Sequence, residues 1–206
     1  MRTHLYLIRH GRTDWNRQER YRGRFDLPLD QEGERQAQAL AQRLAPVPLE
    51  AVYSSPLRRA WSTAQAVVQA RGLEVRTLAG LLDIDYGEWQ GLALDEAQSR
   101  YPKLYRSWQE QPQEVSLPGG ESLAQVQARA TSALEEVSRR HPRALVALVS
   151  HRVVCQVMLC AALGLGLSHF WQVVPEVASL QVLEHEAGRF RVALFNDACH
   201  LRTAEG

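Results

Sequence analysis

The sequence predicts an α/β fold, a three-layer sandwich in which a mostly parallel central sheet has helices on both faces. Short apolar runs typical of strands alternate along the chain with stretches of helical periodicity, which is the pattern of parallel sheets. Hydrophobic residues make up 45% of the 206 residues, enough for one full core. No repeat, low-complexity tract or linker divides the chain, so we expect residues 1–206 to form a single domain.

The first strand is predicted from the apolar run at residues 5–8, which ends where Arg9 and His10 precede Gly11. The most apolar strand is predicted at residues 144–149. The other elements expected, in chain order, are a helix over 31–45, a strand over 49–54, a helix from 55 to about 71, a strand over 74–77, a turn-rich segment over 80–91, one or two helices over 92–111 broken at Pro102, a loop over 112–120, a helix from 122 to about 141, a helix from 150 to about 163, and strands over 177–183 and 190–195.

Residue types at the helix ends explain these boundaries. Asp30, Ser55 and Ser122 have side chains suited to cap the N-terminus of a helix, and Pro56 suits the first helical position. A proline or glycine follows each predicted helix and ends it. Gly188 marks the turn between the two final strands, so the chain should close with a hairpin.

Composition excludes several classes of partner. The formal net charge is +1, which gives no global field for nucleic acid or membranes. No apolar run approaches the roughly 20 residues of a membrane span, and the first one is too short for a signal peptide. Cys155, Cys160 and Cys199 show no CxxC spacing and are interpreted as apolar filler in a reducing compartment. We expect a cytoplasmic monomer or homodimer with no nucleic-acid or membrane partner.

Three strand ends carry the same kind of side chain. Arg9 and His10 follow the first strand, Arg59 follows the second, and His151 with Arg152 follows the strand at 144–149. The carboxyl ends of parallel strands meet at one edge of a sheet, where ligands bind. Two of these ends also start helices, whose N-terminal amides favour anions. Because guanidinium groups match phosphate oxygens, the sequence predicts a pocket for a phosphate-like dianion.

Each of these residues also has an interpretation without a site. An Arg-His pair can belong to a surface loop, adjacent arginines to a solvated helix face, and a histidine after a buried strand to the core. Their coincidence at one sheet edge favours the site. A metal is not expected, because the seven histidines show no ligand spacing and the arginines beside them would repel a cation.

Residues 7–13, LIRHGRT, resemble the RHG signature of the histidine phosphatase superfamily, the phosphoglycerate-mutase-like proteins. The resemblance spans nearly the whole chain, and its closing segment at 196–201 resembles that of small bacterial phosphatases. The further matching segments, in order, are Asn16, 26–29 with Gly33, Gln36 and Ala37, 55–60 with Thr63 and Ala64, 85–91, 118–122 and 149–151.

The resemblance implies a phosphoglycerate-mutase-like fold and a mechanism without a cofactor. His10 would be the nucleophile that takes the phosphoryl group, and arginines beside it should lower its pKa. Arg9, Arg59 and His151 would hold the equatorial oxygens of the phosphoryl group. The residues expected to contact the substrate as well are Asn16, Arg22, Gly23 and Arg152.

The general acid is where the sequence departs from the family. The family places a glutamate four residues before the Gly87 position, and here that residue is Asp83. Asp85 and Glu88 are alternatives, although Asp85 is better interpreted as a turn-forming carboxylate. We expect Asp83 to protonate the leaving oxygen.

The segment at 92–117 favours a phosphatase that hydrolyses small phosphorylated metabolites. Mutases of the family have a longer insertion here with additional basic residues, whereas this segment offers only Arg100, Lys103 and Arg106. A cofactor-dependent phosphoglycerate mutase and a non-catalytic phospho-ligand-binding protein are the alternatives.

The residues on the leaving-group side of the pocket allow two interpretations. Arg12, Arg20, Arg22 and Arg24 form either a rim that recruits a second anionic group or a solvated loop. Among four candidate aromatic residues, we expect Trp89 to line the pocket. His200 is interpreted as packing of the C-terminal segment. The other three aromatic candidates are Trp15, Tyr86 and Trp108.

Overall fold

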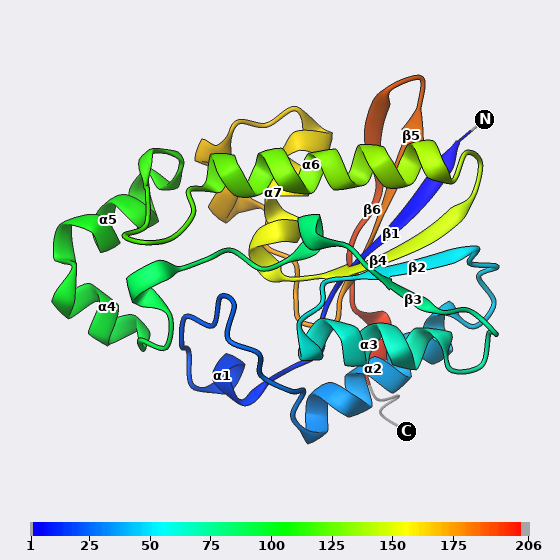
Figure 1. Cartoon of the computed structure of the whole chain (residues 1–206), viewed down its shortest axis with the longest axis horizontal. Helices are drawn as coiled ribbons and strands as arrows, with labels where there is room; N and C mark the ends of the chain where they lie inside the picture. The colour runs from blue at the N-terminus through cyan, green and yellow to red at the C-terminus, as the bar shows by residue number, and fades with distance from the viewer. Residues whose placement is uncertain (1, 203–206) are drawn as a thin grey trace.

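The computed structural model describes residues 2–202 and arranges six strands of this range into one sheet (Figure 1). The strand order is β3-β2-β4-β1-β5-β6. The first four strands of the chain are parallel, and the last two form an antiparallel hairpin at one edge. The strands are β1 (Thr3–Arg9), β2 (Ala51–Ser54), β3 (Val75–Thr77), β4 (Leu145–Ser150), β5 (Leu180–Glu186) and β6 (Arg189–Asp197).

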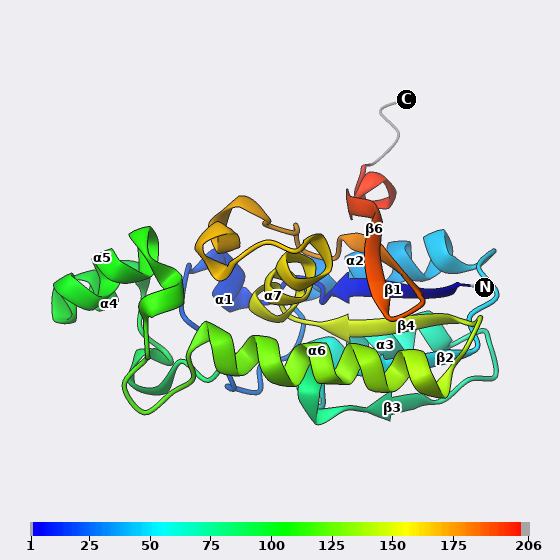
Figure 2. The ribbon, with the colours of Figure 1, turned by 90° about the horizontal axis from the view of Figure 1, so that it is seen from above.

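Helices cover both faces of the sheet, which confirms the predicted three-layer architecture. Helices α2 and α3 lie on one face, and α6 and α7 lie on the other (Figure 2). Three shorter helices, α1, α4 and α5, lie beyond one end of the strands (Figure 1). No helix within residues 2–202 combines the length and the apolar character needed to cross a membrane. The helices are α1 (Asp14–Arg17), α2 (Gln31–Leu44), α3 (Arg58–Val68), α4 (Leu94–Arg100), α5 (Pro102–Glu110), α6 (Leu123–Arg140) and α7 (Arg152–Leu163), with 3-10 turns at Ala79–Leu81, Gly87–Trp89, Pro112–Glu114, Leu167–Gln172 and Cys199–Leu201.

Strand β1 shows how the sequence builds two cores. Its side chains alternate between the faces, so Leu5 and Leu7 pack in the cluster that contains Leu134 of α6. Ile8 points to the other face and packs in the cluster that contains Leu40 of α2. Each of these side chains is essentially fully buried, which contributes about 1.5–3 kcal/mol per residue. The central strand is therefore anchored from both sides.

The parallel strands end together, as predicted. Arg9 at the end of β1 is in register with Ser150 at the end of β4. Ser54 at the end of β2 is in register with Val149, one residue earlier. Figure 2 shows the arrowheads of β1 and β4 pointing toward the end of the molecule where α1, α4 and α5 lie. The side chains that follow these strands are consequently delivered to one edge.

Most predicted helix boundaries are confirmed. The Asp30 carboxylate accepts a hydrogen bond of 2.7 Å from the Gly33 amide, and Ser122 Oγ accepts one of 3.3 Å from the Gln125 amide. Both residues therefore cap their helices. The segment expected to break at Pro102 does so, because α4 ends and α5 begins there.

Two predicted helix starts are wrong. Helix α3 begins at Arg58 rather than at Pro56 after a Ser55 cap, and α7 begins at Arg152 rather than Ser150. Ser55 Oγ is bonded to a histidine across the sheet edge instead of capping a regular first turn. Ser150 remains the last residue of β4, and its hydroxyl donates to the carbonyl oxygen of Leu81 at 2.8 Å. The first strand of the hairpin also starts three residues later than expected, at residue 180.

Candidate active site

His10 is fully buried, with one ring nitrogen bonded and the other free. Its Nδ1 lies 2.6 Å from the carbonyl oxygen of Gly11, which can only accept, so Nδ1 carries the proton. Nε2 is buried and has no hydrogen-bond partner within the described residues. Burial lowers the pKa of His10 well below its usual value, and the guanidiniums of Arg59, Arg22 and Arg9 lower it further. The ring is therefore neutral, with an unshared electron pair on Nε2.

His151 is held beside His10 by two hydrogen bonds. Arg59 Nε donates to His151 Nδ1 at 3.2 Å, so the ring proton lies on Nε2, which donates to Ser55 Oγ at 2.8 Å. The His10 and His151 rings meet edge to face, with their centroids 5.1 Å apart. Burial also lowers the pKa of His151 well below its usual value. Both histidines are thus neutral and have defined tautomers.

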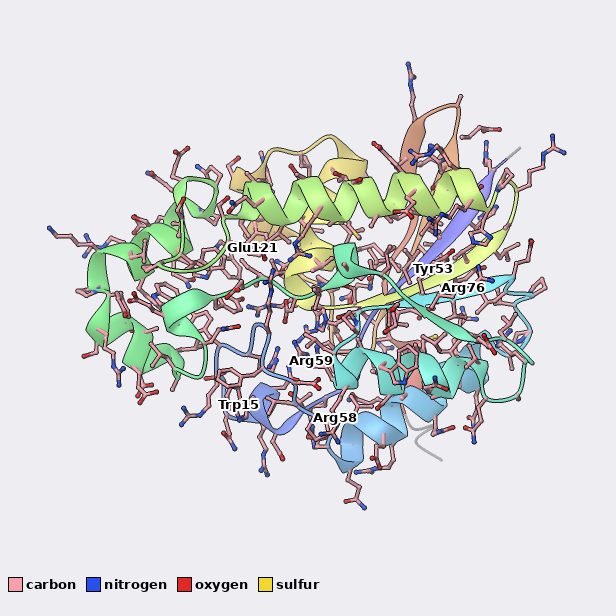
Figure 3. The ribbon with its side chains drawn as sticks, in the orientation of Figure 1. Trp15, Tyr53, Arg58, Arg59, Arg76 and Glu121 are labelled. Carbon is pink, nitrogen blue, oxygen red and sulfur yellow. The ribbon has the colours of Figure 1, made fainter. Side chains whose placement is uncertain are left out.

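Arg59, labelled in Figure 3, lies in the first turn of α3. It is fully buried, and its guanidinium donates to several acceptors. Its two terminal nitrogens donate at 2.7 Å to the carbonyl oxygens of Phe25 and Gly23. One of them also donates to Asp83 Oδ2 at 3.0 Å. Backbone carbonyls therefore orient the guanidinium, and Asp83 is its one carboxylate partner within the described residues.

Gly23 provides one of these carbonyls because it lacks a side chain. Its φ of +51° lies in the left-handed region, and a Cβ there would be 2.4 Å from Gln90 Oε1. The Ile84 carbonyl oxygen would be 3.0 Å from the same atom. Glycine thus lets the chain turn tightly enough for its carbonyl to face Arg59.

Arg9 and Arg22 bring two more guanidiniums to this edge. Arg9 Nη1 donates to the Pro175 carbonyl at 2.8 Å, while the Nε atoms of Arg9 and Arg22 are buried without partners in residues 2–202. Burial lowers the pKa of Arg9 to about 9 and that of Arg22 to about 10. The nearby charge of Arg152 also lowers both pKa values. The site is a concentration of positive charge that an anion would relieve.

Asp83 is the carboxylate at this edge, and it is 5% exposed. Its Oδ1 accepts a 3.0 Å hydrogen bond from the Ile84 amide, and its Oδ2 accepts the bond from Arg59. Oδ2 also lies 3.6 Å from Nδ1 of His151. The carboxyl group is therefore held among the same side chains that surround His10.

Arg129 of α6 holds the backbone of the segment that carries Asp83. Its guanidinium donates to the carbonyl oxygens of Leu82 at 2.6 Å and Asp83 at 3.1 Å. It also forms two 2.9 Å bonds with Glu121, whose carboxylate accepts a third bond of 2.9 Å from the Asp85 amide. Glu121 precedes α6 (Figure 3). The two charged residues therefore clamp residues 82–85 onto α6.

A cavity of about 560 Å³ opens at this edge. Three predicted residues, His10, Arg59 and His151, are almost completely buried and lie behind its wall. An anion in the cavity would therefore reach His10 past guanidinium groups. The predicted residues on the wall are Arg9, Asn16, Arg22, Gly23, Asp83 and Arg152.

Asn16 lies in the short helix α1 and is oriented by Thr13. Its side-chain oxygen accepts two 2.9 Å hydrogen bonds, from the backbone amide and from the hydroxyl of Thr13. The amide nitrogen of Asn16 is the remaining donor of a side chain that lines the cavity.

The prediction for Trp89 is wrong. It is fully buried, with ring centroids 5.0 Å from Tyr21 and 6.4 Å from Trp108. Helices α4 and α5 pack over the 3-10 turn that carries Trp89, so Trp89 belongs to the hydrophobic core. Trp15 and Tyr86, two of the other candidates, do line the cavity.

The basic loop is divided in the structure. Arg12, Arg20 and Arg22 line the cavity, whereas Arg24 does not. Arg24 instead forms ion pairs with Asp85 at 3.2 Å and with Glu121 at 3.3 Å. Arg17 of the same loop lines the cavity as well, so four of the five arginines in residues 12–30 contribute to the rim.

Of the three carboxylates considered as the acid, Asp83 alone lines the cavity. Asp85 accepts a 2.9 Å hydrogen bond from the Gly87 amide, as expected for a turn-forming residue. Glu88 is exposed and accepts from the Tyr101 hydroxyl at 2.8 Å.

The C-terminal segment packs as expected, with one exception. His200 Nε2 lies 3.1 Å from the Ala178 carbonyl, away from the cavity wall. Cys155 and Cys160 are buried, but Cys199 is exposed, so its interpretation as apolar filler is wrong. Cys199 belongs to a terminal 3-10 turn, which presents it to solvent.

Sequence reasoning missed three supporting groups: Ser55 as a partner of His151, the Arg129–Glu121 clamp, and Trp171. The Trp171 ring lies 5.6 Å below the guanidinium carbon of Arg152. Ser55 and Glu121 lie in the segments 55–60 and 118–122 that resemble the family, so the resemblance could have indicated a role for both residues. Arg129 and Trp171 carry no local signal, because their partners are distant in sequence.

Comparisons with known proteins agree with this geometry. Residues 5–198 match the model of the histidine phosphatase superfamily, branch 1. Phosphoserine phosphatase 1 of Hydrogenobacter thermophilus is 41% identical over 197 residues, which cover 96% of this chain and 93% of that protein. The solved structure of Bacillus stearothermophilus YhfR aligns with a TM-score of 0.92 at 33% identity, covering 97% of this chain and all of that one. A mycobacterial glucosyl-3-phosphoglycerate phosphatase aligns with a TM-score of 0.89 at 29% identity, covering 96% and 100% of the two chains.

Proposed function

The chain belongs to the histidine phosphatase superfamily and is a phosphatase, and on this premise we propose that His10 carries a phosphohistidine intermediate. The enzyme would be a metal-independent phosphoric monoester hydrolase of the histidine acid type that acts on small phosphorylated metabolites. The observation that carries the proposal is the buried, unpartnered Nε2 of a neutral His10, facing arginines. A nucleophile needs that free electron pair, and a phosphoryl group needs those cations.

In the first step, His10 Nε2 attacks phosphorus while the bond from phosphorus to the leaving oxygen breaks. Asp83 supplies the proton that the leaving oxygen takes up. In the second step, Asp83 removes a proton from water, the water oxygen bonds to phosphorus, and the N–P bond breaks. Inorganic phosphate leaves, and both residues return to their starting protonation states.

The surrounding donors stabilise the charge that spreads over the phosphoryl oxygens. Arg9, Arg22 and Arg59 supply guanidinium groups, and backbone carbonyls rather than carboxylates satisfy most of their bonds to protein. His151 is placed beside them, and the Asn16 amide adds a neutral donor. Arginines of this density would repel a metal ion, which supports catalysis without one.

The helices at 92–117 support a phosphatase over a mutase. Arg100, Lys103 and Arg106 are exposed and lie away from the cavity wall. The segment contributes Leu94, Tyr105 and the amide of Gln109 to the wall instead. Because residues 92–117 place no basic side chain on the wall, we infer that water, rather than a second phosphorylated molecule, accepts the phosphoryl group. A cytoplasmic location is proposed because the three cysteines are unpaired, as in reducing compartments.

The test is hydrolysis of p-nitrophenyl phosphate in excess EDTA by the wild type, the His10→Ala variant and a His169→Ala control, which removes a half-buried histidine that does not line the cavity. We expect metal-independent turnover that only His10→Ala abolishes. Undiminished turnover by that variant would overturn the assignment. Conversion of 3-phosphoglycerate to 2-phosphoglycerate without phosphate release would show a mutase, and vanadate binding without any phosphate release would show a non-catalytic ligand-binding protein.

A further inference from the structure

Arg152 is positioned to bind an anion in the cavity, farther from His10 than the arginines that surround that histidine. It is the first residue of α7, directly after His151, and it lines the cavity. Its guanidinium lies over the ring of Trp171, whose indole nitrogen donates to the Trp108 carbonyl at 2.8 Å. A guanidinium stacked on an anchored aromatic ring is preorganised for binding.

No carboxylate neutralises this guanidinium. Within residues 2–202, no ion pair joins Arg152 or Arg22 to an acidic side chain. Burial lowers the pKa of Arg22 most, the charge of Asp83 raises it, and the charges of Arg59 and Arg152 lower it again, so Arg152 and Arg22 are close enough for each other's charge to matter. An unpaired, partly buried pair of guanidiniums is costly unless an anion binds.

Arg152 also differs from the arginines nearest to His10. After burial, the charges that most lower the pKa of His10 are those of Arg59, Arg22 and Arg9. Arg152 acts instead on Arg9, Arg22 and the buried Tyr86. Because Arg152 lines the cavity and is the residue directly after His151, a group bound to Arg152 would lie beside the transferred phosphoryl group, as a leaving group does.

We propose that Arg152, assisted by Arg22, binds a second anionic group on the leaving group, so that the preferred substrates are small phosphomonoesters that carry a carboxylate or a second phosphate. Both groups match the planar fork of a guanidinium. The cavity of about 560 Å³ has room for such a molecule. This inference rests on the proposed phosphatase activity and adds the class of substrate.

The rim arginines are the competing receptors. Arg12 is paired with Asp30 at 2.7 Å, and Arg20 is paired with Glu96 at 3.6 Å while also donating to the Gly91 carbonyl. Their charge is already balanced by the protein. Arg152 is the better receptor for that reason.

The experiment compares substrates that differ only in the second anion. 3-Phosphoglycerate and glycerol 3-phosphate have the same primary leaving oxygen, and a carboxylate replaces a hydroxymethyl group. Fructose 1,6-bisphosphate and fructose 6-phosphate test a second phosphate in the same way. The measured quantity is the ratio of kcat/KM within each pair, for wild type, Arg152→Gln, Arg152→Lys, Arg20→Gln and the control Arg106→Gln.

For wild type we expect at least one ratio to favour the doubly anionic substrate. Arg152→Gln should lower that ratio about 10- to 100-fold, as expected for loss of a charge-assisted hydrogen bond. Arg152→Lys should restore part of the ratio, and Arg106→Gln should leave it unchanged. The pair that shows the effect identifies the anion as carboxylate or phosphate.

Three outcomes would overturn the inference. The wild type could hydrolyse both members of each pair equally well, Arg152→Gln could slow both members by the same factor, or Arg20→Gln could lower the ratio in its place. Failure of the proposed function is distinct from all three, because the wild type would then release no phosphate from any of these substrates or from p-nitrophenyl phosphate.

Discussion

The buried arginines near His10 and the more exposed arginines at the cavity rim are used in opposite ways. Arg9 and Arg59 are buried and donate mainly to backbone carbonyls, and Asp83 is the one carboxylate within residues 2–202 that pairs with Arg59. Arg12 and Arg17 are more exposed and are paired with aspartates of their own loop. The difference teaches that positive charge is most available to a ligand where backbone carbonyls supply most of the acceptors that orient a guanidinium. The number of arginines in the loop is a poor guide to binding strength.

The largest effect is expected for the buried arginine of an adjacent pair (Figure 3). Arg59→Gln should lower kcat/KM for p-nitrophenyl phosphate about 10³-fold, because it removes a preorganised cation from the phosphoryl site. Arg58→Gln is the matched control, since its side chain is exposed one residue earlier. Steady-state kinetics with thermal unfolding of both variants would test this. A loss below tenfold in a folded Arg59→Gln would remove Arg59 from the site.

The next largest effect is expected for Asp83, the carboxylate that pairs with Arg59. Asp83→Asn should slow hydrolysis of an alkyl phosphate about 10²-fold and that of p-nitrophenyl phosphate much less, because a good leaving group needs no proton. Asp85→Asn should have the smaller effect on the alkyl substrate. The reverse ranking of the two variants would reassign the acid.

A smaller effect, again larger on an alkyl than on an aryl phosphate, is expected for Arg129, which holds the backbone of the segment that carries Asp83. Arg129→Gln should lower kcat for the alkyl phosphate about tenfold by allowing the carboxyl group to shift, and it should largely spare the aryl phosphate. Arg140→Gln on the same helix is the control, because Arg140 is exposed and, within residues 2–202, forms its ion pair with Glu136 of the same helix. Equal losses on both substrates would mean that Arg129 stabilises the fold without positioning the acid.

The smallest effect is expected at the rim. Arg12→Gln should change kcat/KM for 3-phosphoglycerate less than about fivefold, the scale of a partly exposed ion pair. A larger loss that disappears in high salt would show that the rim attracts substrate over distance, which would erase the contrast between the two sets of arginines.

The sequence predicts the parts of the site that depend on local pattern. Arg9, His10 and His151 were placed together because each follows an apolar run, and parallel pairing then brings the strand ends into register. Asp83 is implied by the resemblance to the family, which places a carboxylate four residues before the Gly87 position. The sequence therefore predicts the nucleophile candidate and its cationic surroundings.

The remainder depends on packing between distant segments. Trp89 stands in a turn-rich stretch that looks exposed, and α4 and α5 bury it. Arg129 reads as one more charged residue on a long helix, yet it reaches carbonyls 46 and 47 residues earlier in the chain. Ser55 is a residue type that often caps helices, but its hydroxyl instead accepts a hydrogen bond from His151 across the sheet edge. No periodicity or spacing encodes these contacts.

The bond between His10 Nδ1 and the carbonyl of Gly11 has a consequence for how such a pocket can diversify. The tautomer of the nucleophile is set by the main chain of the next residue, so no side-chain substitution is needed to maintain it and few could disturb it. The wall of the cavity can then exchange side chains, and with them its preferred leaving groups, while the reactive nitrogen keeps its electron pair. Selection can therefore act on substrate choice and on reactivity as nearly separate traits.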